Sequence, residues 1–235
     1  MMKTEQQLPL QLSLRDDATF ENFLCGKNTI VLEALHALLA NRGEHFIYCW
    51  GALGVGRSHL LQACCHALAS TSNQVVYLSL QNMPSLSPSV LENLEQLSLI
   101  CIDDIDVVLG NTQWEEALFH FYNRVRDANS RLVVSASCAP RESNCQLMDL
   151  RSRLAWGLVF KIESLTDEEK IQALQMRAEN RGLVLPKEVG QYLLRRFPRN
   201  MVNLFDVLEK LDQASLIAKR LLTIPFVKTV LSHFD

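Results

Sequence analysis

The chain of 235 residues has no surplus of positive charge. Its 23 lysines and arginines are outnumbered by 26 aspartates and glutamates, which gives a formal net charge of −3 and a pI near 6.1. Proteins that bind nucleic acid or anionic membranes through a basic patch show the opposite balance. We therefore expect no strong direct DNA binding and no membrane-surface role.

Long apolar runs and a secretory signal are also missing. No apolar stretch approaches the ~20 residues that cross a bilayer, and the N-terminus lacks the apolar core of a signal sequence. These absences favour a cytoplasmic protein. With 48% hydrophobic residues, the chain can still bury a full core, in one domain or in one domain with a small companion.

The seven cysteines form an odd set without any C-x-x-C pair. Five of them stand in apolar surroundings, which favours buried free thiols in a reducing compartment: Cys25, Cys49, Cys64, Cys65 and Cys101. Cys64, Cys65 and His66 are consecutive, but side chains diverge by about 100° per residue on a helix and cannot converge on one ion. We expect no metal there.

A glycine-rich segment, residues 51–58 (GALGVGRS), has the spacing of a phosphate-binding loop, with Arg57 in place of the usual lysine. An apolar run at 46–50 precedes it and an amphipathic helical pattern follows it, as such a loop requires. Glycines let the backbone N–H groups point at phosphate oxygens, and the helix N-terminus adds positive field. The segment, hereafter the phosphate loop, predicts nucleotide binding by Gly51, Gly54, Val55, Gly56, Arg57, Ser58 and the adjacent His59. The larger, planar guanidinium of Arg57 argues against efficient hydrolysis.

The apolar run at 99–102 ends in two acids, Asp103 and Asp104. After a phosphate loop, Asp103 is the expected partner of Ser58 in holding Mg²⁺. Asp104 follows where many such ATPases place a water-polarising glutamate, but an aspartate is one methylene shorter. The alternative interpretation is a pair of surface acids at a strand end.

Strand and helix patterns alternate from residue 16 to 162. The expected elements are helix 29–40, strand 46–50, helix 59–70, strand 75–80, helix 84–97, strand 99–102, helix 113–128 and strand 131–136. This order predicts an α/β domain with a parallel sheet covered by helices on both faces. In such sheets, ligands bind beyond the carboxyl ends of the strands, where the phosphate loop and the two acids fall.

Residues 163–235 carry helix signals only. Thr166 and Glu169 form a capping box and Gly182 follows as a stop signal, with further helices over 186–196, 201–219 and 225–234. We expect a small all-helical domain here, a nucleotide-binding domain over 16–162 and a flexible tail over 1–15.

The segment 151–157 (RSRLAWG) places two arginines around a serine, with Asp149 as the only acid nearby. Surface arginines are common, so this pair alone carries little information. Because it follows a phosphate loop and an acidic strand, we interpret it as an arginine finger, which stabilises transition-state charge on a neighbouring subunit's nucleotide.

The ordered segments GALGVGRS, LICIDDID, RLVVSASCAP and LRSRLAWG, followed by a helical lid, resemble the AAA+ module of the bacterial replication initiator DnaA. Residues 19–23 (TFENF) resemble the start of that module, which implies that Phe20 and Phe23 line the adenine pocket. In LPLQLSLRDDATF, SRLAWG and LTIPFVK the chain is most similar to a regulatory branch of DnaA homologues. The resemblance covers nearly the whole chain.

Members of that branch bind ADP, attach to the DNA-loaded sliding clamp and stimulate ATP hydrolysis by DnaA. The resemblance implies the same partners here, with ADP and Mg²⁺ as ligands, Arg153 as the finger acting in trans and little or no hydrolysis by the chain itself. It also implies that a Q-L-x-L motif, Gln7, Leu8 and Leu10, grips the clamp as an extended peptide. Residues 11–14 (QLSL) are a second candidate, and the oligomeric state, including a homo-oligomer, stays open.

The chain departs from the initiator pattern at several positions. Ser137 stands where the sensor strand usually has an acid, Val202 falls on the sensor-two arginine with Arg199 nearby, and Arg57 replaces lysine. These changes favour ADP as a bound ligand over a catalytic cycle. The chain also ends where the initiator's DNA-binding domain would begin. Two rivals remain: a self-sufficient P-loop ATPase that loads or recruits a replication protein, and a DNA-binding initiator-like module, which the acidic pI disfavours.

Overall fold

The structure is a computed structural model that describes residues 14, 17–69, 73–81 and 87–232. Its α/β part is built on a five-stranded sheet in which every neighbouring pair is parallel, in the order β2-β3-β4-β1-β5. The strands are β1 (Phe46–Trp50), β2 (Val75–Ser79), β3 (Leu99–Asp103), β4 (Arg131–Ala136) and β5 (Leu158–Lys161). The predicted fold class is thereby confirmed.

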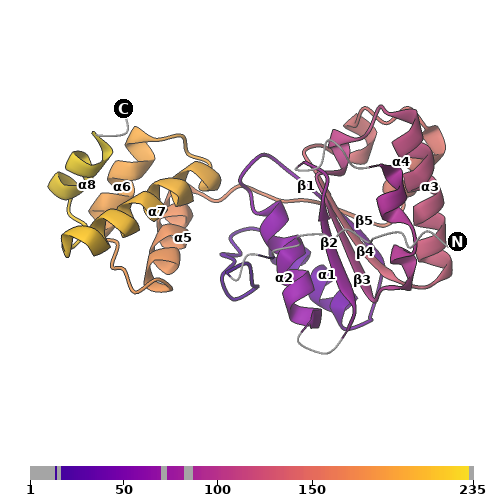
Figure 1. Ribbon diagram of the computed structural model, residues 1–235, viewed down its shortest axis with the longest axis horizontal. Coiled ribbons are helices and arrows are strands. Elements are labelled where there is room, and N and C mark those ends of the chain that lie inside the picture. Colours follow the sequence, from indigo (N-terminus) through magenta and orange to yellow (C-terminus); the bar gives the residue numbers. More distant parts are fainter. Residues whose placement is uncertain (1–13, 15–16, 70–72, 82–86, 233–235) are drawn as a thin grey trace, which may run out of the picture.

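Helices cover both faces of this sheet (Figure 1). The helices α1 (Thr29–Leu39) and α2 (Arg57–Ala69) pack on one face, and α3 (Thr112–Asp127) and α4 (Met148–Leu154) pack on the other. Successive strand residues point to opposite faces, so Ile47 joins the α1/α2 core and Tyr48 joins the α3/α4 core. Because both faces are buried, the central strands β1, β3 and β4 are mostly apolar.

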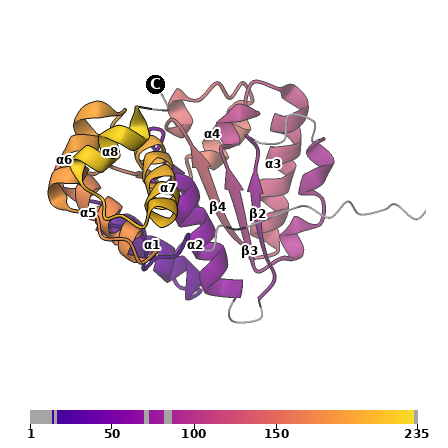
Figure 2. The same cartoon turned by 60° about the vertical axis from the view of Figure 1, so that its left-hand side comes forward.

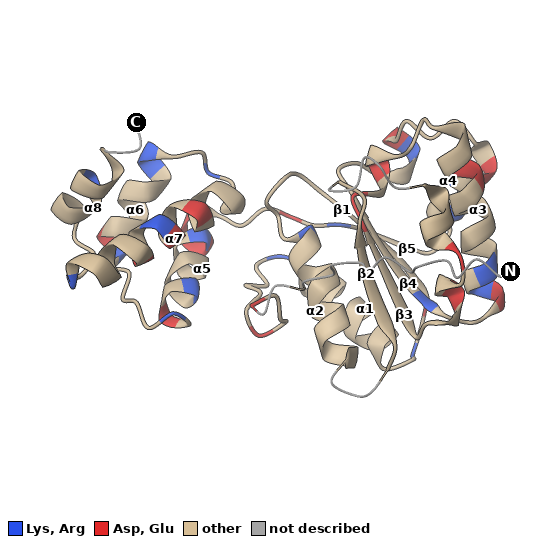
Figure 3. Ribbon diagram, in the orientation of Figure 1, with Lys and Arg blue, Asp and Glu red and all other residues tan. Residues whose placement is uncertain are grey.

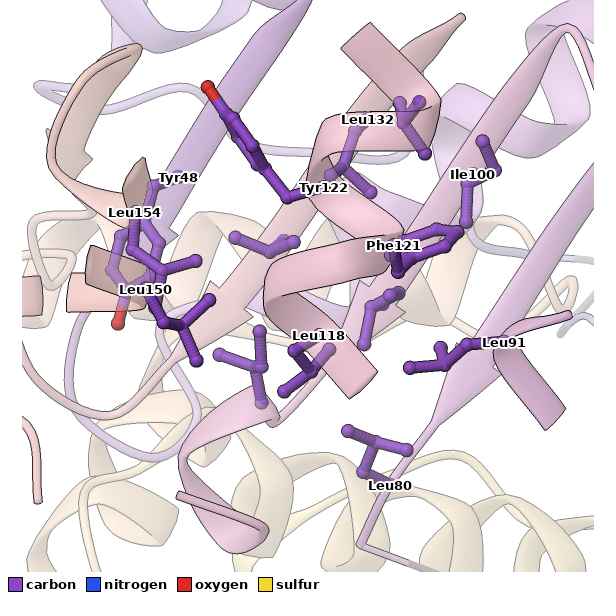
Figure 4. Packing of buried hydrophobic residues seen from close by; sticks show 14 of the residues in the cluster. Tyr48, Leu80, Leu91, Ile100, Leu118, Phe121, Tyr122, Leu132, Leu150 and Leu154 are labelled. Carbon is purple, nitrogen blue, oxygen red and sulfur yellow. The ribbon is translucent and has the colours of Figure 1, made fainter. Parts of the chain in front are cut away.

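The α3/α4 core is packed around aromatic side chains (Figure 4). The Phe46 and Tyr122 rings meet edge-to-face with centroids 5.1 Å apart, and Phe121 is fully enclosed. Leu150 and Leu154 of α4 reach into the same cluster. This burial fixes α4 against α3, although α4 has only 7 residues.

Four further helices form a separate bundle, hereafter the lid (Figure 2). They are α5 (Asp167–Glu179), α6 (Lys187–Arg196), α7 (Met201–Ala218) and α8 (Ile224–Leu231), and they share an apolar core of their own. The capping box is present as predicted: the Thr166 side chain accepts from the Glu169 N–H, and the Glu169 carboxylate accepts from the Thr166 N–H. Gly182 lies beyond the end of α5 with φ +72°, the left-handed conformation that favours glycine.

The predicted helix over 84–97 was wrong. In the described part of this segment, the chain forms two short 3-10 turns, Pro88–Leu91 and Leu94–Gln96. Pro88 cannot donate a helical hydrogen bond, and Asn93 is left-handed with φ +64°. Sequence reasoning also missed α4 and β5, which carry no clear period; β5 is an edge strand that is largely exposed.

Acidic and basic residues are interspersed over α3, α4 and the lid (Figure 3). None of the described helices is both long and apolar enough to cross a membrane. The seven cysteines are free thiols; Cys49, Cys64, Cys65 and Cys101 are buried as predicted, whereas Cys25 is only half-buried.

Candidate nucleotide-binding site

The phosphate loop connects β1 to α2 and contains two glycines with positive φ, Gly54 at +82° and Gly56 at +102°. A side chain at Gly56 would come within 2.6 Å of the Phe23 ring, and one at Gly54 would come within 3.1 Å of the backbone nitrogen of Met201 in the lid. Glycine is therefore required by both backbone conformation and space. The loop is enclosed by the N-terminal segment and the lid.

A cavity of about 330 Å³ lies between the loop, the N-terminal segment and the lid. This volume is in the range of small-molecule sites. The predicted residues that line it are Phe23, Gly54, Val55, Gly56, Arg57, Ser58, His59 and Asp104. The structure therefore brings most of the predicted nucleotide-binding residues together around one cavity.

Three predicted residues, Gly51, Phe20 and Asp103, are not among the residues that line the cavity. Gly51 packs against the carbonyl of Ile162, where a side chain would come within 2.8 Å. The Phe20 ring packs on His36 with centroids 4.4 Å apart, and Asp103 is 1% exposed under the loop. His59 ties the N-terminal segment to α2, because its Nε2 donates to the Thr19 carbonyl at 2.7 Å and its ring lies 5.5 Å from Phe23.

Arg57 and Asp104 form a buried ion pair within the cavity wall. The guanidinium Nη2 lies 3.1 Å from Asp104 Oδ1, and the two side chains are only 10% and 12% exposed. Nη1 of Arg57 is buried without a hydrogen-bond partner. A buried guanidinium N–H normally has an acceptor, so Nη1 lacks a partner in this arrangement.

The backbone holds Asp104 in an unusual conformation. Its φ is +55°, in the left-handed region, and its N–H donates to Ser135 Oγ at 3.0 Å. Burial first, and then the nearby charge of Asp103, raise the pKa of the Asp104 carboxyl to about 6, while the Arg57 charge opposes the rise. Asp104, which stands where a catalytic acid is expected, is thus held in an ion pair with Arg57.

Both predicted magnesium ligands, Ser58 and Asp103, interact with the hydroxyl of Tyr77. The Tyr77 hydroxyl donates to Asp103 Oδ2 at 2.7 Å and also interacts with Ser58 and Gln62. Asp103 Oδ1 accepts from the Ser135 hydroxyl. Each oxygen of the Asp103 carboxylate therefore accepts one hydrogen bond, and a cation between Ser58 and Asp103 would compete with the Tyr77 hydroxyl. The hydroxyl and carboxylate oxygens suit Mg²⁺ chemically.

The lid contributes three cations to the cavity lining: Lys170, Arg177 and Arg199. The sequence pattern had pointed to Arg199, beside the sensor-two position, but not to Lys170 or Arg177. Lys170 and Arg177 stand seven residues apart in α5, a spacing that places them on one helix face and could have signalled them. Arg177 pairs with Asp17 and lies 5.1 Å above the Phe205 ring, whereas Arg199 pairs with Asp167 at 3.0 Å.

Neither sensor position carries the charged residue of the initiator pattern. Val202 lines the cavity with an apolar side chain, which offers no contact that could read a phosphate. At the end of β4, Ser137 donates through its backbone N–H and its hydroxyl to Asp106 Oδ2. Its polar groups are thereby directed to the loop after β3.

Arg153 is not among the residues that line the cavity. It is in α4, and its guanidinium lies 4.7 Å from the ring centroid of Trp156, which is 66% exposed. The next residue, Gly157, packs on Phe46, at the start of β1, whereas the phosphate loop follows the end of β1. The side chain therefore stands at the opposite end of β1 from its own phosphate loop. Gln7, Leu8 and Leu10, the predicted clamp motif, lie outside the described residues.

A phosphate loop after β1, an acidic end of β3 and a helical lid over the cavity define a P-loop nucleotide-binding module of the AAA+ class. Residues 14–161, more than half of the chain, match the model of the bacterial DnaA ATPase domain. Residues 167–231 match the model described as the lid domain of Hda. The chain belongs to the DnaA family of AAA+ proteins and is an Hda-like member of it.

Solved structures share the fold. Domain III of DnaA from Thermotoga maritima matches with a TM-score of 0.81 at 24% identity, over 94% of this chain and 98% of that one. AMPPCP-bound DnaA from Aquifex aeolicus matches with a TM-score of 0.69 at 23% identity, over 83% and 66%. The Holliday junction branch migration motor RuvB from Thermotoga maritima matches with a TM-score of 0.63 at 16% identity, over 87% and 68%.

Proposed function

We propose that this protein is an ADP-bound adaptor that links the initiator DnaA to the DNA-loaded sliding clamp and stimulates hydrolysis of DnaA-bound ATP. Converting the initiator to its ADP form would limit re-initiation of DNA replication. The match of 167–231 to the Hda lid supports a regulator of DnaA. The proposal adds three details to this match: ADP is the bound nucleotide, the sliding clamp is a partner, and this protein contributes to catalysis by DnaA.

The position of Arg153 carries the proposal. An arginine that acts in cis would have to reach its own cavity, but Arg153 stands at the other end of β1, beside the exposed Trp156. Arg153 itself is half-buried, and the exposed Trp156 ring beside it marks a surface that a neighbouring subunit would contact. In a complex with DnaA, the Arg153 guanidinium would neutralise charge that develops on the γ-phosphate of the initiator's ATP, an interaction absent from the ground state.

The cavity supports ADP as the bound nucleotide. The glycine loop provides backbone N–H groups for two phosphates, and Phe23 with the lid encloses a space for the base. Arg57 and Asp104 stand where ATPases use lysine and glutamate, and they pair with each other. This engagement favours a retained ligand over turnover, and it argues against the rival function of a self-sufficient P-loop ATPase.

The experiment that tests the function measures ATP hydrolysis by DnaA with this protein, DNA-loaded clamp and ADP, each omitted in turn. We expect hydrolysis to be stimulated only when all three are present. Vigorous hydrolysis by the isolated protein, unaffected by DnaA or the clamp, would instead support the self-sufficient ATPase.

A further inference from the structure

The ion pair between Arg57 and Asp104 identifies which end of the cavity these residues occupy. In a phosphate loop, the basic residue at this position reaches the β- and γ-phosphates. Asp104 Oδ1 lies 3.1 Å from the Arg57 guanidinium, and both residues line the cavity. The Asp104 carboxylate therefore stands at the end of the site where the third phosphate of a triphosphate would lie.

We propose that Asp104 competes with the terminal phosphate of a nucleoside triphosphate for Arg57, and that this pair selects a diphosphate. The inference rests on the proposed function in taking ADP as the resident nucleotide. It assigns the preference to a particular pair of side chains, in addition to the missing sensor contacts.

Charge compensation is the physical basis of this selection. The Asp104 carboxylate already neutralises the guanidinium, so a γ-phosphate gains no net positive charge from Arg57 and meets a carboxylate instead. Like charges a few ångströms apart in a partly buried site repel strongly. A diphosphate still binds the backbone N–H groups of the loop and places no charge beside the Asp104 carboxylate.

Asp104 has little freedom to move aside. Its left-handed backbone, with φ +55°, is anchored by the hydrogen bond from its N–H to Ser135 Oγ at 3.0 Å. Ser135 in turn donates to Asp103, which Tyr77 also holds. The short aspartate side chain then leaves few rotamers, so the carboxylate stays beside Arg57.

The test is Asp104→Asn, which removes the charge while asparagine still accepts the left-handed backbone. Asp104→Gly is a second charge-free variant that adopts positive φ without strain, in case the first unfolds. Binding of ADP and of a non-hydrolysable ATP analogue is titrated with Mg²⁺ and with EDTA. We expect the preference for ADP over the analogue to fall by about tenfold or more.

Asp106→Asn is the matched control, because it removes a charge two residues away that bonds to Ser137. It should leave the preference within about threefold. In an Arg57→Gln background, Asp104→Asn should also change the preference little, since the contested guanidinium is gone. An unchanged preference in both Asp104 variants, an equal change in the control, or a wild type without preference would each overturn the inference. If the wild type prefers ADP through Asp104 but fails to stimulate DnaA, the proposed function falls and the selectivity stands.

Discussion

The carboxylate of Glu115 in α3 accepts a hydrogen bond of 2.7 Å from the backbone N–H of Leu147, the residue directly before α4. It also accepts from the N–H groups of Gln146 at 2.9 Å and Gly110 at 2.7 Å. One buried acid thus satisfies amide groups at the start of the helix that carries Arg153. The placement of the proposed finger depends on a side chain in a neighbouring helix.

We expect Glu115→Gln to destabilise the fold by about 1–3 kcal/mol at neutral pH, because an amide accepts these bonds less strongly and brings unmatched N–H groups. Denaturant unfolding measures the loss. Glu116→Gln, at the exposed neighbouring position, is the control and should have little effect. Equal stability of the two variants would show that the amide contacts do not anchor α4.

The same contacts predict a pH dependence. Burial alone would raise the pKa of Glu115, but hydrogen bonds from the amides of Gln146, Gly110 and Leu147 outweigh it and lower the pKa below 4.5. A lowered folded-state pKa stabilises above the unfolded pKa, and this contribution disappears as pH falls through the folded value. The stability difference between wild type and Glu115→Gln should therefore shrink below about pH 4.5.

Gly56→Asp should weaken ADP binding by about a hundredfold or more, because a carboxylate would face the phosphates and a side chain would enter the Phe23 ring. Isothermal titration measures the affinity. Gly43→Asp is the matched control: its φ is +86°, yet nothing lies within 4 Å of an added Cβ. The Gly43→Asp variant should show only the effect of backbone strain, and it should still bind ADP. Comparable binding by the two variants would place the nucleotide elsewhere.

We expect Mg²⁺ to change ADP affinity by less than about threefold, because the Tyr77 hydroxyl lies between Ser58 and Asp103. Tyr77→Phe removes that hydroxyl, and the ratio of affinities with Mg²⁺ and with EDTA should then rise to about tenfold. Tyr48→Phe is the control, since it removes a buried hydroxyl that donates to the Cys138 carbonyl at 3.0 Å. A strong Mg²⁺ dependence in the wild type would contradict this account.

The clamp proposal rests on the sequence motif, so its test is a substitution there. Gln7→Ala with Leu8→Ala should abolish binding to the clamp while leaving thermal stability and ADP affinity unchanged. Gln11→Ala with Leu12→Ala is the matched variant in the second motif. If only the second variant loses the clamp, that motif is the anchor; if neither does, the proposed clamp site is wrong.

Much of the fold could be predicted because its signals are local. The strand 46–50 is a continuous apolar run and the strand 131–136 has an apolar centre, Leu132–Val134, and both matched the structure. The capping box at Thr166 and Glu169 is likewise a contact within one turn. In contrast, β5 is a short edge strand whose apolar residues are partly exposed, and its identity depends on pairing with β1.

The site was predicted as a set of residues but not as a set of contacts. The loop spacing identified Arg57, and the strand end identified Asp104, but their ion pair depends on how α2 packs against β3. The intervening Tyr77 hydroxyl and the lid cations Lys170 and Arg177 belong to elements with no motif of their own. Such contacts join residues that are distant in the sequence, so local sequence patterns do not predict them.

The central claim is that Arg153 acts on the nucleotide of a neighbouring DnaA. The direct measurement is ATP hydrolysis by DnaA with loaded clamp, ADP and either wild-type protein, Arg153→Ala or the α4 control Arg151→Ala. Arg153→Ala should lower the stimulated rate by about 10³-fold or more, while its ADP binding, clamp binding and melting temperature stay near wild type, and Arg151→Ala should cost much less. Full stimulation by a folded Arg153→Ala variant would contradict the account, and the catalytic group would then lie elsewhere.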